Sequence, residues 1–542
     1  MLRELLKKKS RFSYIKYEYN FFTFILFYAF FSLISFNYIW LKQTIKSINM
    51  ESFKDFMFFL QLFITILSAY ILIYFVLCFK YTTKFICIIL LIINSLCSYF
   101  MIFYGAVIDK DMLNNVIQTN FKESLDLLSS TLAIWLFIFV ALPSFIIIKA
   151  QIKYKSIFQE MISRAIFSIA LIVLVATITF FNFQKTSIFI RTNNIGQNLV
   201  PRNYITAIIS LANQQAKIEK DLINITDEIK ISESANKLLT IVIVGETARK
   251  HNFSLYGYTR QTNKTLQEKD LFIMNNTTSC WTSTAISLPC MFSHLNRSNF
   301  LDNSKNFELL PRLLNRSGVK VFWKDNNSGG CKGVCNDVEV IEKDIDPNLC
   351  PSGECVDGIL LKNLKEQIKS SRNKNTLVIL HQNGSHGPRY YKRYPKEFEI
   401  YKPICNSAEL KNCSREELIN TYDNTIVYTD HFISQTINFA KNLNIPASVI
   451  YMSDHGESLG ENGLYLHGFP YAIAPKEQKE IPFLIWLSHD FFKKNKVNKK
   501  CVTSKPSYSH DNLFHTVLGL FNVTTPVYDK SLDIFSGCIE RI

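Results

Sequence analysis

The chain has 542 residues, enough for several domains, and it is rich in aromatic residues, with 44 Phe and 25 Tyr. A mean hydropathy of +0.08 and the concentration of apolar residues in the first third indicate a membrane protein and exclude an ordinary soluble one. The net charge of +15 could indicate nucleic-acid binding, but much of the excess lies in loops predicted to be cytoplasmic. An anionic membrane surface is therefore the simpler partner, and no nucleic acid is expected.

Five apolar stretches are long enough to cross a bilayer, which needs about 20 residues per helix. They cover residues 21–41, 56–79, 85–107, 132–148 and 166–183. The first is too long and too aromatic for a cleavable signal peptide, so we interpret it as a retained helix. Lysine and arginine residues precede the first span and lie in the second and fourth loops, which are therefore predicted to face the cytoplasm. With an odd number of spans, everything after the fifth lies on the outer face.

Cysteine usage agrees with this topology. Three of the 13 cysteines fall within spans, and the other ten lie in the C-terminal region. An even number on the oxidising side of a membrane predicts disulfides. Sequential pairing would join Cys280 to Cys290, Cys331 to Cys335, Cys350 to Cys355, Cys405 to Cys413, and Cys501 to Cys538. Connectivity does not follow from sequence alone, and a metal cluster between Cys331 and Cys355 is an alternative that oxidation would oppose.

The region after the spans changes character twice. Residues 185–237 are predicted to form a bridge near the membrane surface, with a helix at 204–222. Short β-branched runs then alternate with helical segments, which is typical of an α/β sandwich with a largely parallel sheet. The runs are residues 238–244, 319–323, 376–380, 448–452 and 482–487. We therefore predict a transmembrane domain at 1–184, the bridge at 185–237, and an α/β/α domain at 238–542.

Three of the predicted strands end in side chains that bind metals or phosphates. The first, third and fourth runs are followed by Glu246, by His381, and by the pair Asp454 and His455. Because the carboxyl ends of parallel strands meet at one edge of a sheet, these residues can share one site. Adjacent Asp and His side chains suit a borderline divalent ion such as zinc. A polar loop after a strand would explain any one of these ends, but hardly all three.

Several hydroxyl groups lie in segment 280–290, which the predicted Cys280–Cys290 disulfide would close. One of them is a natural nucleophile. An alcohol is weak at neutral pH, so it requires a metal to lower its pKa and benefits from a helix N-terminus that stabilises an incoming anion. Taken alone, the segment is also compatible with a Ser/Thr-rich helix cap.

Together these segments resemble the membrane-bound phosphoethanolamine transferases that modify lipid A and related envelope glycans, including the mobile colistin-resistance enzymes. The resemblance covers nearly the whole chain. It rests on VGETAR at 244–249, Thr284 and PCMFS within 280–293, GSHGPRYY at 384–391, and SDHGESLGE at 453–461. It implies five transmembrane helices in the bacterial inner membrane and a periplasmic α/β/α domain of the alkaline-phosphatase and sulfatase type. We expect a monomer.

The resemblance implies a catalytic zinc ion with four ligands, Glu246, Thr284, Asp454 and His455. Thr284 would be both ligand and nucleophile, because two carboxylates and one imidazole leave the fourth position to its hydroxyl. His386 and His467 look like a second group of the family's site. They would contact the phosphoryl group or bind a second zinc ion, and the two roles remain open.

Substrate contacts follow from the same resemblance. Lys332 is expected on the phosphate side, with Asn327 as a headgroup contact and His381 as a neighbour. A solvated surface lysine is the alternative for Lys332. If the loop between the third and fourth spans is helical, three polar residues at a spacing of four share one face. These residues, Asn115, Thr119 and Glu123, would form a wall of the lipid headgroup site, with Glu123 attracting the ethanolamine ammonium group.

The expected function is transfer of phosphoethanolamine from phosphatidylethanolamine to an envelope acceptor, with lipid A or lipopolysaccharide as the first candidate. Thr284 would carry the group covalently after diacylglycerol leaves, Lys332 would neutralise charge, and His386 or His467 would move protons. Capping an acceptor phosphate with an amine predicts resistance to cationic peptides and polymyxins. The alternatives are a phosphoglycerol transferase, a phosphodiesterase, and a non-catalytic zinc-binding envelope sensor. A sulfatase is disfavoured because no Cys-x-Pro-x-Arg motif surrounds Thr284.

Overall fold

The computed structural model describes residues 18–541 apart from 120–123, 126, 184, 187–188, 190–194, 218–221, 232–236, 304, 328, 352–353 and 370–373. The chain divides into two compact units. The first comprises Met1–Asp109 and Ser129–Ala207, and the second comprises Lys110–Leu128 and Ile208–Ile542.

The first unit contains the apolar helices. Its long helical elements are α2 (Phe21–Phe36), α3 (Tyr38–Ile48), α4 (Phe53–Leu77), α5 (Thr83–Phe103), α8 (Ser130–Leu136), η2 (Phe137–Ala141), α9 (Leu142–Lys149) and α10 (Ile157–Phe181). Among the described residues, four helices are long and apolar enough to cross a membrane, counting 130–149 as one, and the bent pair α2 and α3 can supply a fifth. The prediction of five spans is therefore confirmed when the bent pair counts as one span.

The first predicted span differs from the structure, because it is broken. Helices α2 and α3 meet at Asn37 with a bend of 73°. The Asn37 side chain is buried, donates to Tyr70 Oη at 2.7 Å, and accepts from the backbone N–H of Val200 at 2.8 Å. These contacts satisfy the amide at the bend, where an unpaired buried amide would cost about 2–7 kcal/mol. Hydropathy alone could not reveal them.

The second unit is built on a seven-stranded sheet with the order β10-β9-β11-β5-β12-β15-β6. Only β15 runs antiparallel to its neighbours. The strands are β10 (Glu339–Ile341), β9 (Lys320–Asp325), β11 (Thr376–His381), β5 (Leu239–Gly245), β12 (Ala447–Ser453), β15 (Phe483–Leu487) and β6 (Leu271–Ile273). All five predicted strands are present. The two that were missed, β6 and β10, have three residues each, too few to show a pattern.

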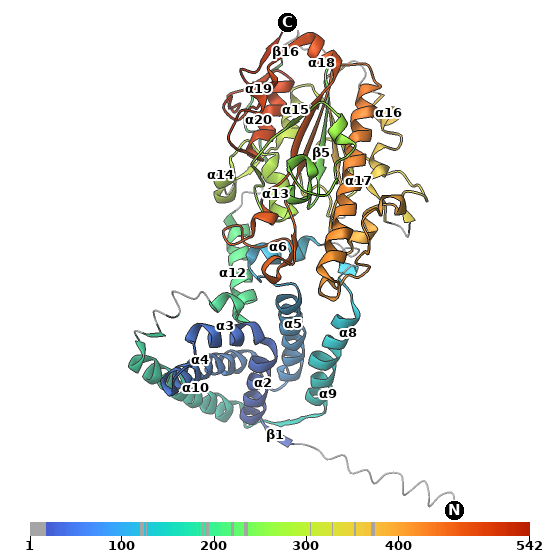
Figure 1. Cartoon of the computed structure of the whole chain (residues 1–542). Coiled ribbons are helices and arrows are strands. Elements are labelled where there is room, and N and C mark those ends of the chain that lie inside the picture. Colours follow the sequence, from blue (N-terminus) through green and yellow to red (C-terminus); the bar gives the residue numbers. More distant parts are fainter. Residues whose placement is uncertain are drawn as a thin grey trace, which may run out of the picture. The chain divides into compact units, whose positions relative to one another are not determined.

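Helices cover both faces of this sheet, so the predicted α/β/α class is confirmed. Along β5, Ile241 and Ile243 face one core together with α17 (Arg415–Lys441), whereas Val242 and Val244 face a second core. The second core includes residues of α13 (Thr284–Met291), α15 (Leu310–Arg316) and α20 (Asp511–Leu520). Figure 1 shows α17 on one side of β5 and these helices on the other. A strand buried on both faces is continuously apolar, as the sequence of β5 is.

The remaining elements of the second unit are short. The helices are α6 (Lys110–Gln118), α14 (Arg297–Asp302), α16 (Leu364–Gln367), α18 (His489–Lys494) and α19 (Lys499–Val502). Paired strands are β3 (Leu222–Ile223) with β8 (Asn306–Phe307), β4 (Lys230–Ile231) with β18 (Val523–Thr524), β7 (Thr277–Thr278) with β17 (Tyr508–Ser509), β13 (Ser458–Leu459) with β14 (Tyr465–Leu466), and β16 (Asn495–Val497) with β19 (Ile539–Arg541). In the first unit β1 (Glu18–Asn20) pairs with β2 (Gln151–Lys153). The bridge helix predicted at 204–222 is α12 (Arg202–Lys217), which begins in the first unit and continues into the second.

The predicted disulfide pairing is confirmed. The five bonds are Cys280–Cys290, Cys331–Cys335, Cys350–Cys355, Cys405–Cys413 and Cys501–Cys538. All ten cysteines lie in the second unit, and the three cysteines of the apolar helices are free thiols. This distribution fits an outer-face second unit in an oxidising compartment.

Candidate active site

The three strands that end in candidate ligands are neighbours. β5 lies between β11 and β12 and runs parallel to both, so their carboxyl ends share one edge. His381 pairs with Val244 at the end of β11, and Ser453 pairs with Gly245. Residues that are far apart in sequence therefore meet here for the topological reason the sequence predicted.

Glu246, Asp454 and His455 form a buried cluster at this edge, and their ligand atoms all lie within 4.8 Å of one another. His455 Nε2 lies 3.4 Å from Asp454 Oδ2 and 3.6 Å from Glu246 Oε1. Asp454 Oδ1 accepts the backbone N–H of His455 at 2.7 Å, whereas Oδ2 is buried and accepts no hydrogen bond from the described residues. Two buried carboxylates this close repel each other unless a cation lies between them. The arrangement therefore fits a divalent metal.

His455 presents a lone pair to this cluster. Its Nδ1 lies 2.8 Å from the carbonyl oxygen of Gly456, which leaves Nε2 to face the carboxylates. Burial lowers the pKa of His455 to about 4, against the opposing effect of Asp454. The imidazole is thus neutral near pH 7, which is the form that binds metals.

Thr284 completes the cluster from a different element. Its Oγ1 lies 3.2 Å from both Glu246 Oε2 and His455 Nε2. Thr284 is the first residue of α13, and Ser283 before it has an extended backbone with φ −148°. The unpaired N–H groups and the dipole of a helix N-terminus favour negative charge at this position. The hydroxyl therefore lies where an anionic group would be stabilised.

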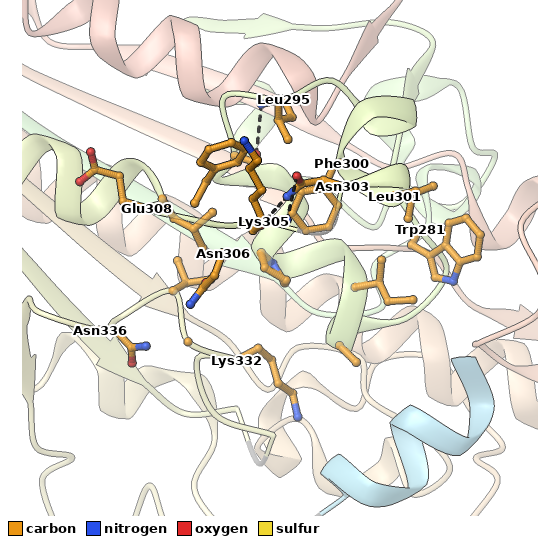
Figure 2. A pocket seen from close by; sticks show the side chains of 18 of the residues that line it. Trp281, Leu295, Phe300, Leu301, Asn303, Lys305, Asn306, Glu308, Lys332 and Asn336 are labelled. Carbon is orange, nitrogen blue, oxygen red and sulfur yellow. Dashed lines mark hydrogen bonds between the residues drawn. The ribbon is translucent and has the colours of Figure 1, made fainter. Parts of the chain in front are cut away.

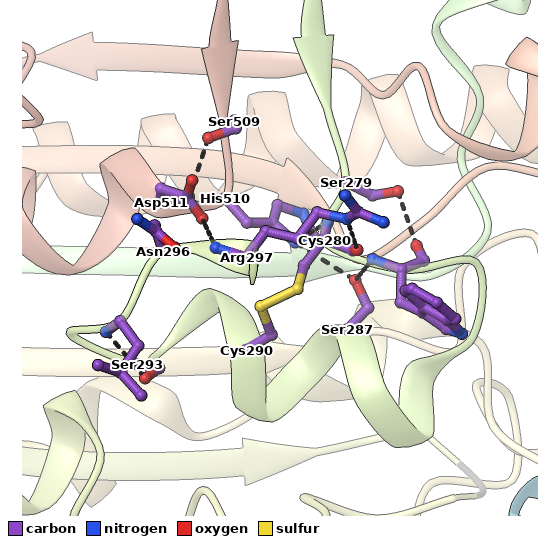
Figure 3. Close-up of a disulfide and its surroundings, with 12 residues drawn as sticks. Ser279, Cys280, Ser287, Cys290, Ser293, Asn296, Arg297, Ser509, His510 and Asp511 are labelled. Carbon is purple, nitrogen blue, oxygen red and sulfur yellow. Dashed lines mark hydrogen bonds between the residues drawn. A yellow bond between two sulfur atoms is a disulfide. The ribbon is translucent and has the colours of Figure 1, made fainter. Parts of the chain in front are cut away.

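Figure 3 shows how the loop before α13 is held. The Cys280–Cys290 disulfide closes it. Ser287 Oγ donates to the carbonyl oxygen of Asp454 at 2.5 Å. His510 accepts the N–H of Cys280 at Nδ1 (3.1 Å), and its Nε2 lies 2.9 Å from the carbonyl oxygen of Ser453. Ser287 and His510 thus link the loop to the end of β12.

His510 was not found from the sequence. It lies on no recognisable motif, and its partners come from two segments distant in the chain. Burial lowers the pKa of His510 to about 4. A neutral ring can accept at Nδ1 and donate at Nε2, which is the pattern that its two partners require.

His386 and His467 lie beside the cluster. The ring centroids of His455 and His467 are 4.5 Å apart, and those of His386 and His467 are 5.5 Å apart. Glu457 Oε2 lies 3.4 Å from His467 Nδ1. Burial raises the pKa of Glu457, although His467 opposes this. Glu457 is part of the SDHGESLGE segment, but its contact with His467 could not be read from the sequence.

A cavity of about 50 Å³ opens beside Thr284. It is lined by Asn115, Gln118, Thr119, Ser283, Thr284, Ala285, Asn327, Gly329, Lys332, His386 and His467. The structure thus brings together most of the residues that the sequence singled out for substrate binding, including two from the outer loop. Glu123 lies outside the described residues.

Two of the singled-out residues contact other protein groups. Asn327 Nδ2 donates to Glu246 Oε2 at 2.7 Å, a contact that orients this carboxylate. His381 is fully buried, does not line the small cavity, and lies with Nδ1 3.2 Å from Asp325 Oδ1.

Lys332 lies in a constrained loop. Its backbone has φ 48°, between Gly330 at φ 67° and Gly333 at φ 83°, and the Cys331–Cys335 disulfide closes the turn. A left-handed backbone at a lysine costs about 1–2 kcal/mol and persists where its surroundings enforce it. The Nζ atom lies 3.4 Å from the carbonyl oxygen of Gln118, at the end of α6.

The loop after β11, which carries His386, depends on the buried carboxylate of Asp357. The Asp357 carboxylate accepts hydrogen bonds from Asn326 Nδ2, Gln382 Nε2 and the backbone N–H groups of Asn383 and Gly384. In Asp357→Asn, an amide NH₂ would face two of these donors, which should lower the free energy of unfolding by about 1–3 kcal/mol. Thermal unfolding of the full-length protein in detergent measures this.

Asp490→Asn is the matched control for that prediction. Asp490 is paired with Lys493 at 3.2 Å on the surface of α18, so the same substitution should change stability by less than about 0.5 kcal/mol. Equal unfolding temperatures for the two variants would show that Asp357 does not hold the loop.

Comparison with known proteins identifies the family. The model described as "Phosphoethanolamine transferase EptA/EptB" matches residues 66–216, and the model described as "Sulfatase" matches residues 239–523. Phosphoethanolamine transferase EptA of Escherichia coli (strain K12) is 36% identical over 99% of both chains. The chain belongs to the phosphoethanolamine transferase EptA family. Phosphatidylethanolamine transferase Mcr-1 of Escherichia coli is 34% identical and covers 85% of this chain and 86% of its own.

Solved structures agree with the assignment of this chain to the phosphoethanolamine transferase EptA family. The integral membrane lipooligosaccharide phosphoethanolamine transferase A (EptA) from Neisseria meningitidis superposes with a TM-score of 0.90 at 32% identity, covering 96% of this chain and 99% of its own. The C-terminal periplasmic domain of EptC from Campylobacter jejuni gives a TM-score of 0.52 at 40% identity over 59% of this chain and 100% of its own. This transferase is therefore an integral membrane enzyme with a periplasmic catalytic domain.

Proposed function

We propose that this phosphoethanolamine transferase moves the group from phosphatidylethanolamine to lipid A or lipopolysaccharide, with Thr284 as the covalent carrier. The observation that supports this most directly is the position of Thr284 Oγ1. It begins α13, lies 3.2 Å from Glu246 and His455, and lines the small cavity with Lys332 and two histidines. A nucleophile, a proton carrier and a cation for the phosphoryl oxygens thus meet at one point.

Glu246, Asp454, His455 and Thr284 would hold a zinc ion. The donor set of carboxylates, imidazole and hydroxyl suits tetrahedral zinc, and the buried Asp454 Oδ2 has no hydrogen-bond donor of its own. When bound, the ion would lower the pKa of the Thr284 hydroxyl and neutralise charge on the phosphoryl group. Asn327 would keep Glu246 oriented through its 2.7 Å hydrogen bond.

In the first half-reaction, Thr284 Oγ1 gives up its proton and forms a bond to the phosphorus of the donor. The bond between phosphorus and the glycerol oxygen breaks, and diacylglycerol leaves after taking up a proton. His386 or His467 would carry that proton, because both line the cavity. Lys332 would balance charge on the phosphoryl oxygens. The outer-loop residues Asn115 and Thr119 would contact the headgroup.

In the second half-reaction, an acceptor oxygen forms a bond to phosphorus as the bond to Thr284 Oγ1 breaks. The proton of the acceptor passes to a histidine, and the threonine is regenerated. Named relatives support a glycolipid acceptor: one is called lipooligosaccharide phosphoethanolamine transferase A, and another Kdo(2)-lipid A phosphoethanolamine 7''-transferase. The product carries an added ammonium group, which lowers the negative charge of the envelope and should reduce binding of cationic peptides.

Intact-protein mass spectrometry tests this proposal. The full-length protein is incubated with phosphatidylethanolamine in detergent, without acceptor, and we expect a phosphoethanolamine adduct on Thr284 together with free diacylglycerol. A glycerol phosphate adduct from phosphatidylglycerol would instead support a phosphoglycerol transferase. Free phosphoethanolamine without an adduct would support a phosphodiesterase. An inert, metal-containing protein would support the sensor and contradict the proposal.

A further inference from the structure

A second, larger cavity of about 550 Å³ lies next to the small one. The two cavities share Ala285 and Lys332 as wall residues, and Thr284, which precedes Ala285 in the chain, lines the small one. Figure 2 shows Lys332 at the lower side of the large cavity, Leu295 at the upper side, and Leu301 with Trp281 to the right. All residues that line it belong to the second unit. The reacting position therefore adjoins a space of the size that ligands occupy, about 300–1,000 Å³.

The small cavity cannot hold a second substrate. Its volume of about 50 Å³ is a few times the roughly 10–15 Å³ that one water molecule needs by the same measure. It has room for a few phosphoryl oxygens but not for a sugar ring. A glycolipid acceptor must therefore place its head beside the small cavity while its reacting oxygen enters it.

The lining of the large cavity suits a sugar. Trp281, Phe300 and Phe307 offer apolar ring surface, which packs against the C–H faces of sugars. Asn336 offers an amide for hydroxyl groups, and Asn303, whose amide bonds the Lys305 backbone, keeps a second N–H and a second lone pair. Figure 2 shows Trp281, Phe300, Asn303 and Asn336 around a common space. Aliphatic side chains, among them Leu222, Ile286, Leu295, Leu309 and Val334, complete the wall, so it is mixed in character.

The charges suit a phosphate. Lys305 is exposed and lines the cavity, and among the described residues its hydrogen bonds are made by its backbone, with Asn303. Glu308 also lines the cavity, but this carboxylate is buried, forms an ion pair with Arg316, and lies 3.6 Å from Arg312. Its charge is therefore compensated within the protein. Asp111 and Asp302 line the cavity too, but basic side chains outnumber acidic ones by four (Lys110, Lys305, Arg312 and Lys332) to three, so Lys305 and Lys332 can face an anion.

We propose that the large cavity binds the phosphorylated sugar head of the glycolipid acceptor. This rests on the proposed transfer to a glycolipid and assigns it a binding site. The sugar lies between the aromatic rings and the amides, a phosphate of the head pairs with Lys305, and the reacting oxygen reaches the phosphoryl group past Lys332. Lys332 thus contacts both the donor and the acceptor, whereas Lys305 contacts only the acceptor.

Equilibrium binding tests this site separately from the chemistry. Full-length protein carrying Thr284→Ala, in detergent, is titrated with lipid A and with its dephosphorylated form. Two cavity variants are compared: Lys305→Glu reverses a charge, and Leu301→Trp fills space. Lys264→Glu is the matched control, because Lys264 is an exposed lysine in the loop that binds α17 through Thr265 and Asp430. α17 covers the other face of the sheet.

We expect Lys305→Glu to weaken lipid A binding by about tenfold or more, the loss expected for one charge-assisted contact. Binding of the dephosphorylated form should change by less than about twofold, because its phosphate contact is absent. Leu301→Trp should weaken the binding of both ligands, and Lys264→Glu should weaken the binding of neither. In an otherwise wild-type background, both cavity variants should form the Thr284 adduct from phosphatidylethanolamine at the wild-type rate.

The inference is overturned if both cavity variants bind lipid A as the control does, or if they slow adduct formation. Slower adduct formation would assign the large cavity to the donor. Lack of an adduct in the wild-type protein would contradict the covalent mechanism, but the binding comparison would still be interpretable, since it requires no turnover.

Discussion

Replacing Thr284 with alanine should abolish phosphoethanolamine transfer, lowering the rate by a factor on the order of 10⁴ or more. Thr284 Oγ1 is the hydroxyl placed against Glu246 and His455, each at 3.2 Å. Without it no covalent carrier forms, and direct attack by the acceptor would have to replace two easier steps by one difficult step. Mass spectrometry of lipid A from cells carrying each variant measures the effect, and the adduct assay on purified protein gives a second readout.

Two hydroxyl variants serve as controls for Thr284→Ala. Thr284→Ser keeps an oxygen at the N-terminus of α13 and should retain measurable transfer. Ser298→Ala removes an exposed hydroxyl that bonds to Asn296 on the surface of α14 and should leave transfer unchanged. If Thr284→Ala cells still modify lipid A at the wild-type level, the chain does not use this threonine, and the sensor or a direct-transfer mechanism gains support.

Asp454→Asn should remove the metal from the purified protein and lower transfer by at least about 10³-fold. The amide oxygen of the introduced Asn can still accept the two hydrogen bonds that Asp454 Oδ1 accepts, from the backbone N–H groups of Thr247 (3.2 Å) and His455 (2.7 Å). It replaces only the buried Oδ2, which faces the cluster. Atomic absorption on purified protein should therefore give about one zinc equivalent or more in the wild type and little in the variant.

Stability separates metal loss from misfolding in this experiment. A chelator should lower the unfolding temperature of the wild type, because bound metal stabilises the folded state and offsets repulsion between Glu246 and Asp454. Asp454→Asn should resist the chelator, since the amide removes that repulsion. Asp430→Asn changes a buried carboxylate on α17 that binds Thr265, so it should keep both metal and activity. A zinc content equal in Asp454→Asn and wild type would contradict the assignment of Asp454 as a ligand.

Features that depend on local pattern were predictable from the sequence. Apolar runs of about 20 residues indicated the spans, because only helices satisfy the backbone inside a bilayer. Continuous β-branched runs marked β5, β11 and β12, because parallel strands buried on both faces need apolar residues at every position. The even cysteine count on the outer face indicated disulfides, and sequential pairing matched because each loop is short.

The shared edge of the sheet was also predictable, but only as topology. Parallel strands place their carboxyl ends together, so Glu246, Asp454 and His455 could be assigned to one region before any distance was known. The role proposed for Thr284 depends on the resemblance to a family, since a Ser/Thr-rich segment by itself is equally compatible with a helix cap.

Contacts between segments that are distant in the chain were decided by the tertiary structure alone. Asn37 breaks the first span because its partners, Tyr70 and Val200, come from other parts of the first unit. His510 links the loop before α13 to the end of β12, although neither neighbour is near it in sequence. Each of these side chains is an ordinary polar residue in the sequence, and its buried partners are what give it a role.

The large cavity is the clearest example of a feature that only the tertiary structure decides. Its walls come from α6, from the segment around α13 and α14, and from the Lys332 loop. Hydropathy and motifs describe neighbours along the chain, whereas a cavity is a space left between side chains that packing brings together. The sequence by itself therefore determined the apolar spans, the five longer strands of the sheet, the presence of disulfides and the family resemblance. Only the folded structure decided which side chains support Thr284 and where a second substrate can lie.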